Sequence, residues 1–136
     1  MPEAPVIEGV EYDRDAPILD REQIDTLLMA DDDAESKALL WQLYELFRDE
    51  GEGKLADLSA VCSANDLPRL RKIVHFVAGS AGNLGLARLA LFYRGIEHAI
   101  DNGTLTDATV CEAPVRREFA IAGEVFRCEM GLDAAE

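Results

Sequence analysis

Apolar residues recur at the three- and four-residue spacing of amphipathic helices along most of this 136-residue chain. No segment shows the strict alternation of a half-buried strand, and the sequence contains no internal repeat. Clear punctuation separates two of the helical patterns, because Asn65 can close one helix, Asp66 can cap the next and Pro68 is tolerated in a first turn. We therefore expect an all-α protein: an antiparallel up-and-down four-helix bundle with an additional short N-terminal helix.

The chain divides into three parts. Residues 1–18 hold three prolines and no helical period, which predicts an extended N-terminal arm. Residues 19–131 are expected to form the bundle, and residues 132–136 a short C-terminal tail. Within the bundle, Asp20 is expected to cap a short first helix that ends at residues 31–33, and Gly51 and Gly53 to bend or interrupt the second helix. Further helices are expected at about 67–82, 86–101 and 115–130.

The composition excludes several classes of protein. With 27 acidic and 13 basic residues the net charge is −14, which disfavours binding to nucleic acid or to an anionic membrane surface. The first residues lack the basic and apolar regions of a signal peptide, and no apolar run is long enough to span a membrane, so we expect a cytoplasmic protein without a signal peptide. Three cysteines are too few and too scattered for a disulfide framework or a zinc site, and we expect reduced thiols.

One segment departs from this acidic background. Between residues 69 and 94 there is no aspartate or glutamate, whereas the segment contains five basic residues. These are Arg69, Arg71, Lys72, Arg88 and Arg94. A local positive charge in a strongly acidic chain indicates a functional surface.

His75 lies within this basic segment, on a predicted helix. At about 100° per residue, its ring falls opposite the apolar stripe of that helix and should face solvent. The residues placed within about 60° of it include two cations and three small residues. These are Arg71, Lys72, Ala78, Gly79 and Gly82. Glycine inside a helix costs stability, which suggests close approach by another macromolecule, although packing against the next helix is an alternative.

Apolar residues beside His75 are candidates for a docking fringe. Val74 and Phe76 flank the histidine, and Leu86 and Leu91 can extend the fringe onto the next helix. Each of the four can equally belong to the edge of the core.

An exposed lone histidine suits few reactions. Catalysis of hydrolysis by a histidine requires an orienting carboxylate and a partner nucleophile, and no acid lies near His75 in the sequence. A metal site wants several ligands at helical spacing, and the second histidine, His98, is expected to be a plain surface residue. Accepting a phosphoryl group needs only an exposed nitrogen, nearby cations and a partner that completes the site.

The residues around His75 resemble the histidine-containing phosphotransfer (Hpt) family. The matched positions of the family's motif are His75, Gly79, Ser80, Leu84 and Gly85. Residues 66–70 resemble the family's capped start of the histidine helix, and Ile96-Glu97 its downstream Leu-Glu position, so that the resemblance covers about residues 18–130.

The resemblance implies a phosphorelay intermediate of two-component signalling. His75 would accept a phosphoryl group from an aspartyl-phosphate on a response-regulator receiver domain and pass it to another receiver. The receiver would supply Mg²⁺ and an acidic pocket, so the chain needs no cofactor of its own. Nothing here resembles an ATP-binding kinase domain, so we expect a phosphocarrier and not an enzyme. Receivers, including those of a hybrid histidine kinase, are the implied partners, and a monomer is the default.

One position departs from the family pattern. The family usually has Lys or Arg three residues after the histidine, where this chain has Ala78. Arg71 and Lys72, one turn before His75, can replace that charge. The alternative is a degenerate module that binds receivers without phosphotransfer. A helical scaffold unrelated to phosphorelay is a third reading.

Overall fold

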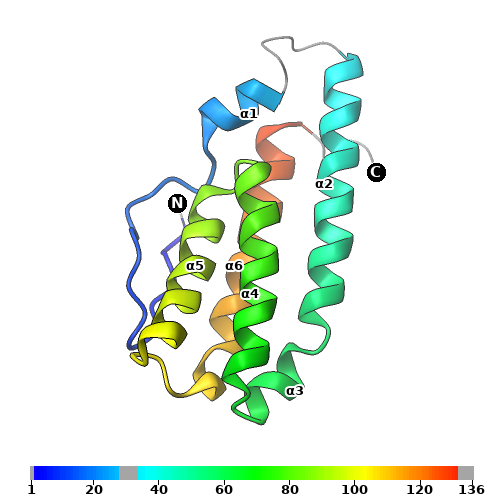
Figure 1. The fold of residues 1–136 in the computed structure, drawn as a ribbon. Coiled ribbons are helices and arrows are strands. Elements are labelled where there is room, and N and C mark those ends of the chain that lie inside the picture. Colours follow the sequence, from blue (N-terminus) through cyan, green and yellow to red (C-terminus); the bar gives the residue numbers. More distant parts are fainter. Residues whose placement is uncertain (1, 28–33, 132–136) are drawn as a thin grey trace.

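The computed structural model describes residues 2–27 and 34–131, and within these residues every regular element is helical (Figure 1). The elements are α1 (Arg21–Leu27), α2 (Ala34–Leu55), α3 (Leu58–Ser63), α4 (Leu67–Asn83), α5 (Ala87–Asn102), the 3₁₀ turn η1 (Ala108–Val110) and α6 (Glu112–Glu129). The long helices α2, α4, α5 and α6 run alternately up and down, which confirms the predicted bundle (Figure 1). The expected helix end at 31–33 and the tail 132–136 lie outside the described residues.

Side chains predicted to cap helices do so. The backbone N–H of Gln23 donates to Asp20 Oδ1 at 3.2 Å at the start of α1, and that of Arg69 donates to Asp66 Oδ1 at 3.2 Å at the start of α4. Asn65 has a φ of 54°, a left-handed conformation that asparagine tolerates and that ends the preceding helical segment. These local signals fix where α4 begins, and therefore where along the bundle His75 is presented.

Of the two expectations for the glycines of the second helix, a bend or an interruption, the interruption is wrong. Helix α2 continues through Gly51 and Gly53 to Leu55, and the chain turns only afterwards. The reason for one of these glycines is packing, because a Cβ at Gly51 would lie 2.6 Å from ring atoms of Phe119 on α6. Gly51 therefore permits close approach of two helices.

The N-terminal arm runs along α5 without helical structure (Figure 1). A buried ion pair of the bundle holds it in place. Arg88 on α5 donates to both carboxylate oxygens of Glu118 on α6, at 2.8 and 3.0 Å, and to the carbonyl oxygen of Pro2 at 2.7 Å. The side chains of Arg88 and Glu118 are fully buried. Because an unpaired buried charge is costly, this cluster ties the arm and two helices together.

Within residues 2–27 and 34–131, none of the helices has the length and apolar character of a membrane span.

The hydrophobic core lies between the helices, where Tyr44 of α2 stacks on Phe126 of α6 with ring centroids 5.2 Å apart. Tyr93 of α5 is fully buried and donates to the carbonyl oxygen of Val115 at 2.8 Å. These contacts make a rigid scaffold for the surface of α4.

Candidate functional site

His75 lies at the centre of α4 and its side chain is 68% exposed. Leu70, Ile73 and Val77, which the helical wheel places on the opposite side, are buried in the core. The prediction of an accessible imidazole is confirmed, because the apolar stripe of α4 fixes the opposite face toward solvent.

A carboxylate of the neighbouring helix holds this imidazole. His75 Nδ1 lies 2.9 Å from Oε2 of Glu97 on α5, and the Glu97 side chain is only 11% exposed. A carboxylate can only accept a hydrogen bond, so Nδ1 carries the proton and donates it. The lone pair of Nε2 is left for an incoming group, which makes Nε2 the nucleophilic atom.

An acid lies beside His75 in the fold although none lies near it in the sequence. Glu97 is 22 residues away in the sequence and is brought to His75 by the antiparallel packing of α4 and α5. The one available signal was the Ile96-Glu97 pair of the family resemblance, which gives no contact by itself.

Arg71 connects this pair to a second carboxylate. Its Nη2 lies 3.0 Å from Glu97 Oε2, and its Nε and Nη2 donate to the two oxygens of Asp101 at 2.6 and 3.0 Å. The hydrogen bond from Arg71 lowers the pKa of Asp101, and the same bond raises the pKa of Arg71. The cation predicted to lie near His75 is therefore already engaged by acidic partners.

The other cations of the basic segment differ in their environments. Arg88 is buried against Glu118, and Arg69 lies 3.9 Å from an oxygen of Asp57. Among the described residues, no hydrogen bond or ion pair is found for Lys72 or Arg94. The sequence therefore overstated the positive surface, because one of its five cations belongs to the interior and two have acidic partners.

The small residues near His75 also differ from one another. A Cβ added at Gly79 would meet no atom within 4 Å, so Gly79 leaves open space beside the histidine. A Cβ at Gly82 would lie 3.6 Å from Nη2 of Arg94, which places that guanidinium across this face of α4. The expected exposure of Ala78 is wrong: it is 1% exposed, because it packs into the hydrophobic core of the bundle. Its methyl group is therefore shielded from direct contact with a partner.

The apolar fringe lies elsewhere than predicted. Val74 and Leu86 are fully buried, so for these two residues the alternative of a core position holds and the docking role is wrong. Phe76 is half-buried beneath Lys54, whose Nζ lies 4.6 Å from the ring centroid. Leu91 is 36% exposed and so remains available for docking.

A larger apolar surface lies on α2 and was missed. Leu39, Leu43 and Leu46 are exposed at helical spacing, although the sequence pattern suggests core positions. Two of them line a groove shared by α1, α2 and the end of α4. Its lining residues are Leu27, Leu43, Leu46, Phe47, Glu50, Ser80, Asn83 and Leu84. This groove, the α2–α4 groove, borders the same helix that presents His75.

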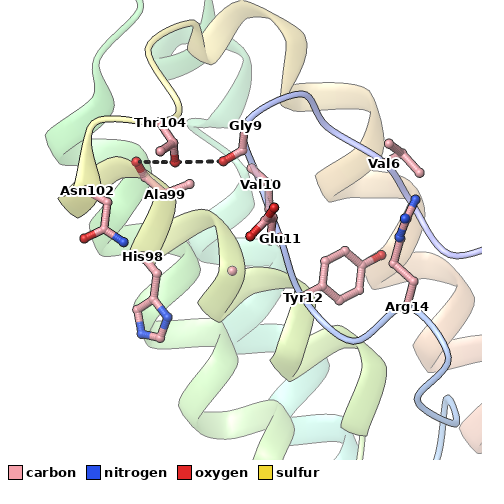
Figure 2. A pocket seen from close by; sticks show the side chains of 11 residues that line it. Val6, Gly9, Val10, Glu11, Tyr12, Arg14, His98, Ala99, Asn102 and Thr104 are labelled. Carbon is pink, nitrogen blue, oxygen red and sulfur yellow. Dashed lines mark hydrogen bonds between the residues drawn. The ribbon is translucent and has the colours of Figure 1, made fainter.

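The second histidine lies in a different setting. His98 and Asn102 of α5 line a hollow that is also lined by Tyr12 and Arg14 of the N-terminal arm (Figure 2). Thr104 closes one end of it by donating to the carbonyl oxygen of Gly9 at 2.8 Å. No hydrogen bond holds the His98 ring among the described residues, in contrast to the Glu97 bond of His75. The prediction that His98 is a surface residue agrees with its exposure.

Fold and site together define a four-helix domain that presents one carboxylate-held histidine. The described residues contain no cluster of histidine, cysteine or acidic side chains able to hold a metal ion. The model of the Hpt domain family matches residues 42–131, about two thirds of the chain, so this protein belongs to the Hpt domain family.

Two known proteins are similar to it. The chain is 35% identical over 79 residues to Multistep phosphorelay regulator 1 of Schizosaccharomyces pombe, a match that covers 56% of this chain and 25% of that protein. The match thus spans about a quarter of that relative's length. The crystal structure of histidine-containing phosphotransfer protein B (HptB) from Pseudomonas aeruginosa PAO1 superimposes with a TM-score of 0.67 at 29% identity, covering 85% of this chain and 96% of that one.

Proposed function

We propose that this protein is a phosphorelay intermediate of two-component signalling. It accepts a phosphoryl group on Nε2 of His75 from an aspartyl-phosphate of a receiver domain and passes it to another receiver. The observation that carries the proposal is the bond between Nδ1 of an exposed His75 and the nearly buried Glu97, at 2.9 Å. That bond orients the ring and directs the free lone pair outward, as nucleophilic transfer requires.

The transfer itself is a single exchange of bonds. The Nε2 lone pair forms the bond to phosphorus, and the bond between phosphorus and the aspartate oxygen breaks with its electrons left on the carboxylate. The proton on Nδ1 stays in place, so the phosphorylated ring becomes cationic and Glu97 offsets its charge. Passing the group onward is the reverse sequence toward a second receiver's aspartate. The protein is thus a phosphocarrier that needs no kinase domain of its own.

In this proposal two cations of the chain offset the negative charge of the phosphoryl group. Lys72, on the exposed side of α4, and Arg94, which reaches across α4 at Gly82, are cations without an acidic partner among the described residues. They substitute for the cation that Ala78 does not supply. The receiver brings Mg²⁺ and its own acidic residues, and the chain binds no cofactor itself.

We extend the proposal to a docking surface that combines His75 with the α2–α4 groove, which borders the same helix. Gly79 leaves open backbone beside the histidine, and Leu43 and Leu46 offer apolar area one helix away. Apolar area beside an exposed polar group is the usual composition of a protein docking site. In this proposal the receiver is either free or part of a hybrid kinase. The protein itself acts in the cytoplasm as a monomer.

The test is transfer of labelled phosphate from phosphorylated receivers. The wild-type protein should acquire label that is labile in acid and stable in base. His75→Gln should abolish the label and His98→Gln should retain it, because only His75 is held by a carboxylate. Label that persists in His75→Gln contradicts the proposal.

The alternative is a module that binds receivers without accepting phosphate. The absence of a cation at Ala78 is the observation that favours it. Binding of a receiver by the wild-type protein, without any transfer of phosphate to it, would select this alternative. Charge-neutral variants of Lys72 and Arg94 refine the result, because slower transfer in Lys72→Gln or Arg94→Gln shows that these residues replace the missing cation.

A further inference from the structure

Arg71 makes a more specific arrangement than a surface cation requires. Its guanidinium joins two carboxylates of α5 that lie one helical turn apart, Glu97 and Asp101. Nε and Nη2 meet the two oxygens of Asp101 in the paired geometry by which arginine recognises a carboxylate. One face of α5 is thereby fixed to the turn of α4 that precedes His75.

The oxygen of Glu97 that meets Arg71 is also the one that meets the histidine. Oε2 lies 3.0 Å from Arg71 Nη2 and 2.9 Å from His75 Nδ1. A hydrogen bond from His75 and an ion pair with Arg71, on adjacent turns of α4, thus meet at one oxygen atom. The Glu97 side chain is 11% exposed, so water competes little for that atom, whereas the His75 ring is 68% exposed.

Two carboxylates share the single charge of Arg71, which leaves the cluster with a net negative charge. Arg71 is therefore engaged by two carboxylates and is not the cation that offsets a phosphoryl group on Nε2. Its geometry instead suits the task of restraining Glu97, because the paired bonds to Asp101 fix the guanidinium and thereby hold Nη2 at 3.0 Å from Glu97 Oε2.

We propose that Arg71 is a positioning residue that fixes Glu97, and thereby keeps the proton of His75 on Nδ1 and the lone pair on Nε2. Asp101 holds Arg71 in place for this task. The inference rests on the proposed function, since it assigns how the phosphoryl-accepting nitrogen is prepared. The transfer step keeps the balance given above: Nε2 gains the bond to phosphorus, the aspartate oxygen loses it, and the Nδ1 proton does not move.

The test reads the histidine tautomer directly. Long-range ¹⁵N–¹H correlation spectra of labelled protein distinguish a ring protonated at Nδ1 from one protonated at Nε2. The wild type should show the Nδ1–H form, whereas free imidazole rings in water favour Nε2–H. Arg71→Gln should shift His75 toward the Nε2–H form and slow phosphotransfer about tenfold, the lower end of the range for removing the partners that orient metal-ligating histidines.

Matched variants separate positioning from general loss of charge. Arg69→Gln removes an arginine from the same helix outside the network and should leave both tautomer and transfer rate unchanged. Arg71→Lys keeps the charge but not the fork and should give intermediate values. Should Arg71→Gln fail to fold, Asp101→Asn removes the anchor of Arg71 and should produce a smaller shift of the tautomer in the same direction.

The outcomes distinguish the two proposals. A wild-type tautomer and a wild-type transfer rate in Arg71→Gln overturn the role of Arg71 while leaving the proposed function intact. Absence of any transfer in the wild type overturns the proposed function, yet the tautomer measurement still decides whether Arg71 positions His75. An equal effect of Arg69→Gln overturns the specific assignment to Arg71.

Discussion

Gly79→Ala should make the protein more stable and a poorer phosphate acceptor. Gly79 lies inside α4, one turn after His75, and its φ is not in the left-handed region. A Cβ there meets no atom within 4 Å, so the new methyl group causes no clash within the chain. Replacing a helical glycine by alanine then contributes about 0.5–1 kcal/mol, chiefly by restricting the unfolded chain. For a domain of this size that raises Tm by about 2–4 °C.

The expected loss of function has a different cause. If a receiver approaches the open backbone beside His75, the added methyl group enters the interface and separates Nε2 from the aspartyl-phosphate. Small displacements of reacting atoms are costly, and we expect transfer to slow by about a hundredfold. Thermal unfolding followed by circular dichroism gives the stability, and label transfer from a phosphorylated receiver gives the rate.

A matched control is available on another helix. Gly53 of α2 is also helical and also has no atom within 4 Å of an added Cβ. Gly53→Ala should therefore give a comparable gain in Tm with an unchanged transfer rate. Unaltered transfer in Gly79→Ala, or equal slowing in both variants, would refute the reasoning that open space at Gly79 serves docking.

Three further predictions concern the charged and thiol groups. Glu118→Ala should lower the free energy of unfolding by about 3–5 kcal/mol, measured in urea, because it leaves Arg88 buried without a partner; a loss below 1 kcal/mol would contradict the ion-pair account. The hydrogen bond from Arg71 lowers the pKa of Asp101, so Asp101 contributes stability above its unfolded pKa, and that contribution is lost as the pH falls through the lower folded value; NMR titration should show the pKa of Asp101 returning upward in Arg71→Gln, and an unmoved value would contradict this. Of the three cysteines only the exposed Cys128 should react rapidly with a thiol reagent in the native state, and the other two only after unfolding, because both are buried; three rapid reactions would show that the interior is open.

Local sequence signals predicted the parts of this fold that depend on neighbouring residues. Asp66 caps α4 as its position before Pro68 suggests, and the apolar stripe of α4 is enough to direct His75 toward solvent. These predictions succeed because the ends of a helix and its apolar face depend on residues a few turns apart in the sequence. How far a neighbouring helix covers the rest of the surface does not depend on those residues, and for this reason the burial of Ala78 was missed.

Contacts between distant segments were beyond the sequence pattern. The bond between His75 and Glu97 joins residues on two helices, and its formation depends on how those helices pack. Arg88 was counted as a surface cation because arginine is rarely fully buried without a partner, and its partner Glu118 lies 30 residues away. Gly51 was expected to bend or interrupt a helix, whereas its missing side chain makes room for the ring of Phe119 on α6. In each case tertiary packing decided the role of a residue whose local pattern suggested another.

The central claim is that Nε2 of His75 is the atom that carries phosphate. Phosphorus NMR of the protein after transfer from a phosphorylated receiver distinguishes a phosphoryl group on Nε2 from one on Nδ1, and fragment mass spectrometry under alkaline conditions identifies the modified residue. The bond from Nδ1 to Glu97 predicts a single phosphohistidine, at His75, with phosphorus on Nε2. Phosphate on Nδ1, or on any other residue, would contradict the account.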